Sequence, residues 1–262
     1  MTRLFSILAA LSVSCMTFAQ EAPVQKGRPN RGQGQANKAD RADHAFHLDF
    51  SESVSFYSFD SDIVVVNTHV GFEATDWLDI SADLPVFNNE VGTGLGDVTL
   101  TGTVGLIDGK CDFLGADTAT LDGFVAFGIP LDGDFSSDNL VITVGGDAGL
   151  GWDSWDLDLG VAYSFVDGAT YVPQLGGFIS GNYGVASGTL AYAFNPKFSV
   201  GGKVVETWSD DSGSILTVGP VATWNINRRI SLTGEVGFSV ADSDLMYGTM
   251  DVCGSLGLSI SF

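Results

Sequence analysis

Basic residues are scarce in this chain of 262 residues, which holds 11 lysines and arginines against 32 aspartates and glutamates, for a formal net charge of −21. A chain this acidic lacks the positive surface that attracts phosphate backbones, which argues against nucleic-acid binding. Histidine and cysteine are also rare, with three residues of each. No CxxC pair, metal-type His/Cys spacing or GxSxG motif is present. We therefore expect no enzyme activity, no metal and no cofactor.

Long apolar runs are missing as well, because no uninterrupted apolar stretch of about 18 residues could form a membrane-spanning helix. Even so, the composition is not hydrophilic: 45% of the residues are hydrophobic, only 16% are charged, and the mean hydropathy is +0.23. The apolar residues are dispersed in alternation with small polar ones. This pattern is typical of strands in a β-barrel whose outer face meets lipid.

The stretch from Met250 to Phe262, read as MDVCGSLGLSISF, shows this alternation clearly. One set of side chains is apolar and the interleaved set is small and polar, as in a strand that is wetted on one side. By itself the stretch would also fit the last strand of a soluble β-sandwich. In lipid, however, a spanning sheet must close to satisfy its backbone hydrogen bonds. A long last strand ending in an aromatic residue favours an outer-membrane barrel, and we expect the barrel-assembly machinery to bind it.

Residues 1–45 are expected to lie outside the barrel. Residues 1–19 resemble a signal peptide, with Arg3, an apolar run and a small-residue cleavage site ending at Ala19. Residues 20–45 are polar and partly basic, which predicts a disordered basic tether. Residues 46–262 would then form the barrel, in contact with outer-membrane lipid and lipopolysaccharide. The isolated Cys111 and Cys253 predict no disulfide.

Twelve alternating segments predict a transmembrane antiparallel β-barrel of twelve strands, with ten or fourteen strands as alternatives. The links between the segments divide into a mostly tight set and a longer, more acidic set, as expected for periplasmic turns and outer loops. Residues 171–183 are assigned to an outer loop, or to an extension of the sheet there, because another strand would make the number odd. The segments are 46–58, 62–74, 77–86, 96–107, 119–131, 139–152, 155–165, 184–195, 197–208, 214–226, 229–240 and 247–262.

The polar face of these segments is rich in Ser, Thr, Gly, Asn and Asp, and we expect it to line a lumen. An excess of carboxylates there would favour cations over anions. In the alternative, several of these carboxylates only solvate strand ends or pair with neighbours. Barrels of ~8 strands are filled by side chains and those of ~16 are wide, so twelve strands predict a narrow or partly plugged pore. The candidate lumen residues are Asp79, Asp83, Asp122, Asp147, Asp156, Asp158, Lys203 and Glu235.

Three short motifs follow one another between residues 84 and 134: Leu84-Pro85-Val86, then Gly94-Leu95-Gly96-Asp97, then Phe127-Gly128-Ile129-Pro130 with Asp132-Gly133-Asp134. Through these motifs, residues 60–262 resemble the outer-membrane "meta-pathway of phenol degradation" family of transporters. The resemblance implies passage of small, hydrophobic or aromatic compounds across the outer membrane. Leu131-Asp132 departs from the family pattern, which commonly has Thr or a small residue before Gly-Asp.

A structural role is the interpretation we favour for the loop residues of these motifs. Positive-φ turns at Gly94 and Gly96 would allow a tight loop, and Asp97 would accept hydrogen bonds from nearby backbone N–H groups. The loop residues are Gly94, Gly96, Asp97, Pro130, Gly133 and Asp134.

A channel or transporter for small molecules is the leading hypothesis for the function. An outer-membrane hydrolase with His69 as its base is a weak alternative, because nucleophilic catalysis needs a serine within reach of the base. A non-conducting structural or adhesion barrel is the stronger alternative, since its lipid-facing pattern would be the same. The acidic outer loops lack the spacing of an EF-hand calcium site.

Overall fold

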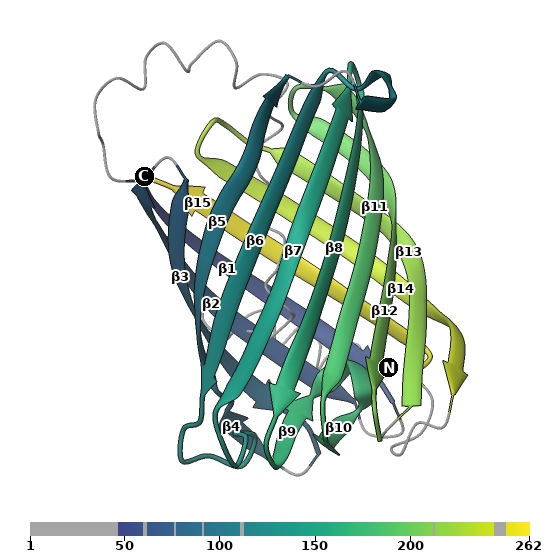
Figure 1. Ribbon diagram of the computed structural model, residues 1–262. Helices are drawn as coiled ribbons and strands as arrows, with labels where there is room; N and C mark the ends of the chain where they lie inside the picture. The colour runs from purple at the N-terminus through teal and green to yellow at the C-terminus, as the bar shows by residue number, and fades with distance from the viewer. Residues whose placement is uncertain are drawn as a thin grey trace.

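A closed antiparallel barrel is the core of the computed structural model, which describes residues 47–262 apart from 60–61, 76, 91, 111–112, 212 and 244–249 (Figure 1). The predicted signal peptide and tether lie outside the described residues. Within the described residues, twelve long strands form the wall of the barrel. They are β1 (His47–Ser58), β2 (Ile63–Thr75), β3 (Leu78–Asn88), β5 (Val98–Lys110), β6 (Thr118–Ile129), β7 (Val141–Trp152), β8 (Trp155–Val166), β11 (Tyr183–Asn195), β12 (Phe198–Ser209), β13 (Gly213–Asn225), β14 (Ile230–Ser243) and β15 (Val252–Ser261).

The first and last strands close the barrel. β1 pairs with β15 over the register from Asp49↔Ser261 to Ser58↔Val252, and with β2 on its other side. Every long strand therefore has two neighbours, which satisfies its backbone groups without water. The prediction of twelve strands is confirmed. Eleven predicted segments begin and end within three residues of the strands, while the twelfth strand begins at Val252 instead of residue 247.

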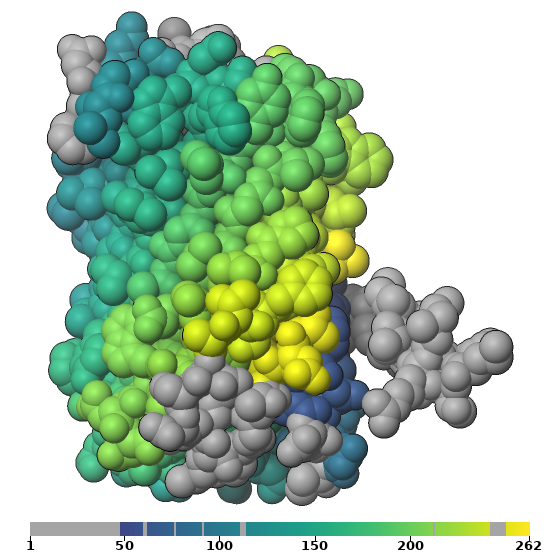
Figure 2. Space-filling view, turned by 90° about the vertical axis from the view of Figure 1, so that its right-hand side faces the viewer, coloured from purple at the N-terminus to yellow at the C-terminus, as the bar shows by residue number. Residues whose placement is uncertain are grey.

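Large apolar side chains cover the outside of the barrel. Alternation along each strand sends one side chain outwards and the next inwards, so the apolar set of the sequence becomes the lipid-facing surface. Leu100, Leu159 and Val204, for example, are exposed on β5, β8 and β12. Figure 2 shows this outer face over the C-terminal strands as a continuous wall of side chains.

A group of aromatic residues marks the end of the barrel where β1 begins and β15 ends, here called the terminus end. Trp155 packs against Tyr192 with ring centroids 5.0 Å apart, and Tyr192 packs against Phe194 at 5.1 Å. Phe198 stacks on Phe194 at 6.1 Å, and Phe262 is exposed at the same end of the barrel beside β1, where its N–H donates to Leu48 O at 2.9 Å. Amphipathic rings of this kind sit at membrane–water interfaces.

The two ends of the barrel differ in the length of their links. At the terminus end the turns are tight, as at residues 153–154 and 196–197, with one longer link that contains the short 3-10 helix η2 (Phe113–Gly115). The opposite end, here called the loop end, carries residues 89–97, 130–140 and 167–182. This asymmetry agrees with the expected division. Among the described residues, no helix has the length and apolar character needed to span a membrane.

The loop from 167 to 182 is not an extension of the barrel sheet. It forms a separate two-stranded sheet, β9 (Ala169–Val172) and β10 (Gly177–Ser180), joined by the 3-10 helix η3 (Pro173–Leu175). A further short strand, β4 (Thr93–Leu95), pairs with the end of β3. Residues 171–182 therefore lie in a loop outside the barrel wall, as assigned, whereas Tyr183 already belongs to β11 and an extended barrel sheet in the loop is excluded.

The orientation of the wall can be tested with paired arginine substitutions. Leu159→Arg places a charge on the lipid face near the middle of β8 and should lower the free energy of unfolding by ~2–4 kcal/mol. Ser187→Arg on β11 faces the lumen and should lower it far less, because its guanidinium can reach water. Urea unfolding in phospholipid vesicles measures both. Equal destabilisation by the two variants would contradict the assigned faces.

Candidate functional site: the lumen and its cap

A cavity of about 530 Å³ lies inside the barrel, and each of the twelve long strands contributes to its lining. Its size falls in the range of small-molecule sites, ~300–1,000 Å³. All eight predicted lumen residues line this cavity. The period of two explains why they meet, since Asp79 and Asp83, or Asp156 and Asp158, are separated by an even number of residues and share a face.

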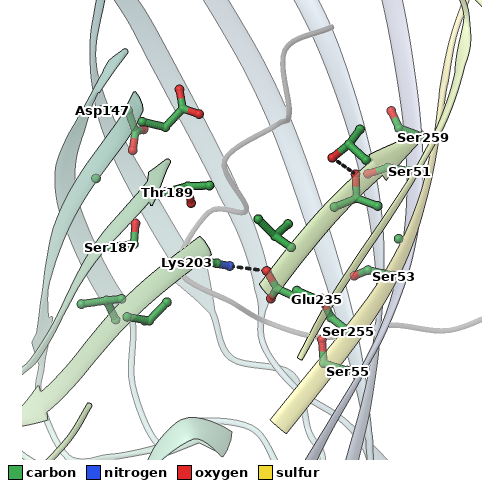
Figure 3. A pocket seen from close by; sticks show the side chains of 18 of the residues that line it. Ser51, Ser53, Ser55, Asp147, Ser187, Thr189, Lys203, Glu235, Ser255 and Ser259 are labelled. Carbon is green, nitrogen blue, oxygen red and sulfur yellow. Dashed lines mark hydrogen bonds and ion pairs between the residues drawn. The ribbon is translucent and has the colours of Figure 1, made fainter. Parts of the chain in front are cut away.

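Six of the seven predicted lumen carboxylates gather on one side of the lumen. The six predicted aspartates come from β3, β6, β7 and β8, which with β5 are consecutive in the wall, and Asp122 stands directly opposite Asp147 in the β6–β7 register. The other wall, β11 to β15 and β1, presents mainly Ser, Thr and Gly. Its charged pair is Lys203 with Glu235, whose Nζ–Oε2 distance is 2.7 Å (Figure 3).

A polar cluster on β2 and β3 joins three lumen side chains. Asn67 Nδ2 donates to Asp83 Oδ1 at 2.8 Å, and His69 Nδ1 lies 3.0 Å from the same oxygen. Asn67 is 4% exposed. The sequence placed Asp83 in the lumen, but it did not identify these partners, nor the pairing of Lys203 with Glu235. Cross-strand neighbours become visible only once the register is known. No group of three His, Cys, Asp or Glu side chains in the described part of the chain could hold a metal ion.

The loop end of the lumen is covered by residues 169–180, here called the cap segment. Tyr171, Val172, Leu175 and Ile179 of this segment are 1–7% exposed. They belong to one apolar cluster, here called the mouth cluster, whose other buried members come from the barrel strands, from the loop 130–140 and from a position two residues before the last strand. Those members are Tyr57, Ile63, Val65, Phe87, Phe135, Ile215 and Met250.

The mouth cluster extends across the barrel. Tyr171 packs edge-on against Phe87 of β3, with centroids 4.8 Å apart, and against Phe135 at 5.0 Å. On the far side η3 packs against β12 and β13, where Ile215 is buried. β3 and β13 are separated by four strands on one side of the ring and by six on the other. The cap segment therefore spans nearly the full diameter and forms an apolar ceiling over the polar cavity.

Asp97 of the GxGD motif fixes the loop 130–140 that supplies Phe135. Its Oδ1 accepts hydrogen bonds from Ser136 Oγ at 2.7 Å and from the backbone N–H of Ser137 at 2.9 Å, and its Oδ2 accepts from Ser137 Oγ at 2.5 Å. Asp97 is 3% exposed, so these bonds offset the cost of burying its charge. The expected backbone hydrogen bond of Asp97 is present.

The predicted reason for the motif glycines was wrong. Neither Gly94 nor Gly96 has a positive φ. Instead, a Cβ at Gly96 would overlap the Phe87 ring, and one at Gly94 would lie 2.9 Å from Phe135 Cδ2. These glycines let the two aromatic rings pack closely against the loop backbone, and Phe87 and Phe135 stack on each other at 5.4 Å.

The remaining motif residues lie in the loop 130–140. Pro130 directly follows β6, and Gly133 approaches the carbonyl of Leu95, which a Cβ there would meet at 2.9 Å. Asp134 is exposed. The second of the three motifs, at residues 94–97, and the third, at residues 127–134, therefore come together in one loop assembly at the mouth.

The mouth cluster was missed in the sequence. Its signal is a group of apolar residues inside segments that otherwise have the composition of outer loops, such as Phe135 and the stretch from Tyr171 to Leu175. A solvated outer loop has no need of such side chains, whereas a segment folded into the barrel buries them.

The family of the chain follows from its sequence as a whole. Residues 27–249 match the family described as "Putative MetA-pathway of phenol degradation". The match covers more than half of the chain, and the chain belongs to this family, as its motifs predict. A search of curated proteins finds no match.

Solved structures with the same fold are outer-membrane barrels. The COG4313 outer membrane channel from Pseudomonas putida F1 is similar with a TM-score of 0.62 and 14% identity, over 84% of this chain and 97% of that one. The NanC porin has a TM-score of 0.57 and 11% identity, over 80% and 98%. A KdgM porin in complex with disordered oligogalacturonate has a TM-score of 0.52 and 10% identity, over 82% and 99%. At these identities the likeness shows the transmembrane barrel fold.

The anchoring role of Asp97 predicts a local change in protection. Asp97→Ala removes the acceptor of Ser137 N–H and the partner of Ser136, whose Oγ accepts the N–H of Leu131 at 2.8 Å. Hydrogen exchange of the Leu131 and Ser137 amides should then speed up, with a loss of ~1.5–3 kcal/mol in local opening free energy. Asp134→Ala, an exposed acid in the same loop, is the matched control. Unchanged exchange in Asp97→Ala would show that the loop does not depend on this carboxylate.

Proposed function

We propose that this protein is an outer-membrane channel for small molecules, whose acidic lumen favours cations. The observation that carries the proposal is a closed barrel with an apolar exterior around a cavity of about 530 Å³, lined by Ser, Thr, Gly and Asp together with apolar residues, to which all twelve strands contribute. In a barrel with a purely structural role the inward side chains would fill the interior as a core, whereas this wall leaves an internal cavity and presents Ser, Thr, Gly and Asp to it. The fold it shares with channels and porins supports the same function.

The preference for cations rests on the inner wall. Seven carboxylates among the predicted residues line the cavity against one lysine, and that lysine is bound to Glu235. A lumen of this composition has a negative potential, which raises the local concentration of cations. The family description mentions phenol degradation and names no transported molecule. We extend the proposal to small hydrophobic or aromatic compounds, with which the apolar ceiling over the cavity is compatible.

The surroundings of the channel follow from the same proposal. Outer-membrane lipid would contact the apolar belt, and lipopolysaccharide would contact the loop end. The barrel-assembly machinery would bind β15, which pairs with β1 to close the barrel and ends next to the exposed Phe262.

The second candidate is a non-conducting structural barrel. The mouth cluster favours it, because a ceiling of apolar side chains across the lumen stops ions as long as it stays in place. The two functions therefore differ in whether the cap segment can be displaced.

Planar-bilayer recordings test the channel directly. The purified chain should give discrete, cation-selective current steps in a salt gradient. Asp79→Asn, Asp147→Asn and Asp158→Asn together should lower the cation preference. A carboxylate within ~4 Å of an ion contributes about 1 kcal/mol at the dielectric of water, or about fivefold in local cation concentration.

The matched control removes three charges outside the lumen. Asp132, Asp134 and Asp211 are exposed in the loops, and their change to asparagine should leave selectivity nearly as it was. Equal selectivity of the wild type and the lumen variant would refute the role of the acidic wall. Absence of current from a folded, heat-modifiable barrel would favour the structural alternative.

Removal of the cap segment tests whether the mouth cluster limits the current. Ala169 and Ser180 are paired across the hairpin, so a short Gly-Ser link can replace residues 170–179 without stretching the barrel. The shortened chain should give larger currents than the wild type. Leu175→Asp, which places a charge in the ceiling, should act in the same direction. If both variants fold and their currents equal that of the wild type, the cap segment is not the barrier.

A further inference from the structure

Three cross-strand rows of inward side chains lie below the ceiling on β1, β2 and β3. In the row nearest the loop end, Val65 and Phe87 belong to the mouth cluster. The next two rows are mostly polar. From the loop end downwards the rows are Ser55–Val65–Phe87, Ser53–Asn67–Pro85 and Ser51–His69–Asp83.

The polar cluster in these rows leaves several hydrogen-bond acceptors unused. A carboxylate only accepts, so Asn67 must direct its NH₂ group at Asp83, which fixes the orientation of the amide. Asn67 Oδ1 is then a buried acceptor with no hydrogen-bond partner among the described residues. In the same way, His69 in its neutral form donates from Nδ1 to Asp83 Oδ1, which leaves Nε2 as an acceptor.

Asp83 itself offers a further acceptor. Both hydrogen bonds from Asn67 and His69 go to its Oδ1. Asp83 Oδ2, Asn67 Oδ1 and His69 Nε2 thus belong to three bonded side chains that line the cavity. The cluster thus combines one negative charge with unused acceptors on three bonded side chains, and an ammonium group brings one positive charge and three N–H donors.

Two hydroxyls extend the set. Ser55 Oγ and Thr101 Oγ1 are buried, at 2% and 3% residue exposure, and have no hydrogen-bond partner among the described residues. Leaving a buried polar atom without a partner is costly, which favours an ordered water or a ligand group beside these hydroxyls.

Apolar side chains line the same cavity on the side of the ceiling. Tyr57, Val185, Val205, Ile215 and Met250 contribute to its lining. A molecule with its charged group at Asp83 can therefore place an apolar body among these residues and remove its surface from water.

We propose that Asn67, His69 and Asp83 form a binding site for a small organic cation, a primary ammonium attached to an apolar or aromatic group. Such a site would define the substrate class of the channel, so this inference rests on the proposed function. A simple metal ion lacks the apolar part that the upper cavity would cover, and an anion would meet the carboxylate of Asp83.

Three probes of one shape test the proposal on the full-length chain in detergent. They are 2-phenylethylammonium, the neutral 2-phenylethanol and the anion 3-phenylpropionate, with binding measured by isothermal titration calorimetry. The ammonium should bind at least about tenfold more tightly than the alcohol, and the anion should not bind, because only the ammonium forms charge-assisted hydrogen bonds with Asp83.

Variants locate the binding. Asp83→Asn should weaken ammonium binding by about tenfold or more, and Asn67→Ala by a smaller factor. Glu73→Gln is the matched control: Glu73 lies on the same strand face as His69 but outside the cavity lining, so the affinity should be unchanged. Heat modifiability on gels checks that each variant folds, and the comparison of probes on the wild type does not depend on any variant.

Bilayer recordings with 2-phenylethylammonium separate this site from the channel itself. If the ammonium blocks the current through the wild type but not through Asp83→Asn, the result supports both the binding site and the channel. Suppose that the chain conducts normally but binds amine and alcohol equally, or that Asp83→Asn binds the amine as well as the wild type does. The binding site is then refuted while the channel remains supported, and water alone fills the unused acceptors. Specific ammonium binding to a barrel that never conducts keeps the site and overturns the channel.

Discussion

Hydrogen bonding of the backbone in an apolar medium is the constraint on which the rest of this structure depends. Lipid offers no partner for an N–H or C=O group, so the strand pairing has to run around a complete ring, and the contact of β1 with β15 completes it. Once the ring is closed, alternation along each strand divides the side chains into two surfaces. The apolar outer surface, the polar lumen and the aromatic belt beside Trp155 and Phe194 all follow from that division.

This dependence explains how much of the fold could be predicted from the sequence. Strand positions could be found because a period of two is a local signal, and each predicted lumen carboxylate lies on the face that the alternation implies. Register is not local: the bonds of Asp83 to Asn67 and His69 depend on which residue of β2 stands beside which residue of β3. The same holds for Gly96, whose role is set by a ring from β3 that packs onto it from outside its own segment.

The mouth cluster shows how a loop takes part in a barrel without joining its sheet. Twelve strands enclose more space than their own inward side chains fill, and a chain segment can occupy the surplus at one end. Gly168 and Gly181, with φ of 109° and 84°, turn the chain on either side of the cap segment. A residue with a side chain would be strained in that conformation. Asp97 then holds the neighbouring loop, so that Phe135 and Tyr171 meet over the cavity.

The uneven placement of charge around the lumen has an effect on the direction a solute faces. Carboxylates on β3, β6, β7 and β8 lie across from a wall of hydroxyls and glycines, which creates an electric field perpendicular to the barrel axis. Such a field exerts a torque on any dipole inside. A molecule with a positive end would turn that end towards the acidic wall and travel broadside along it. The cross-section that the molecule presents along the barrel axis is then set by its orientation as well as by its size.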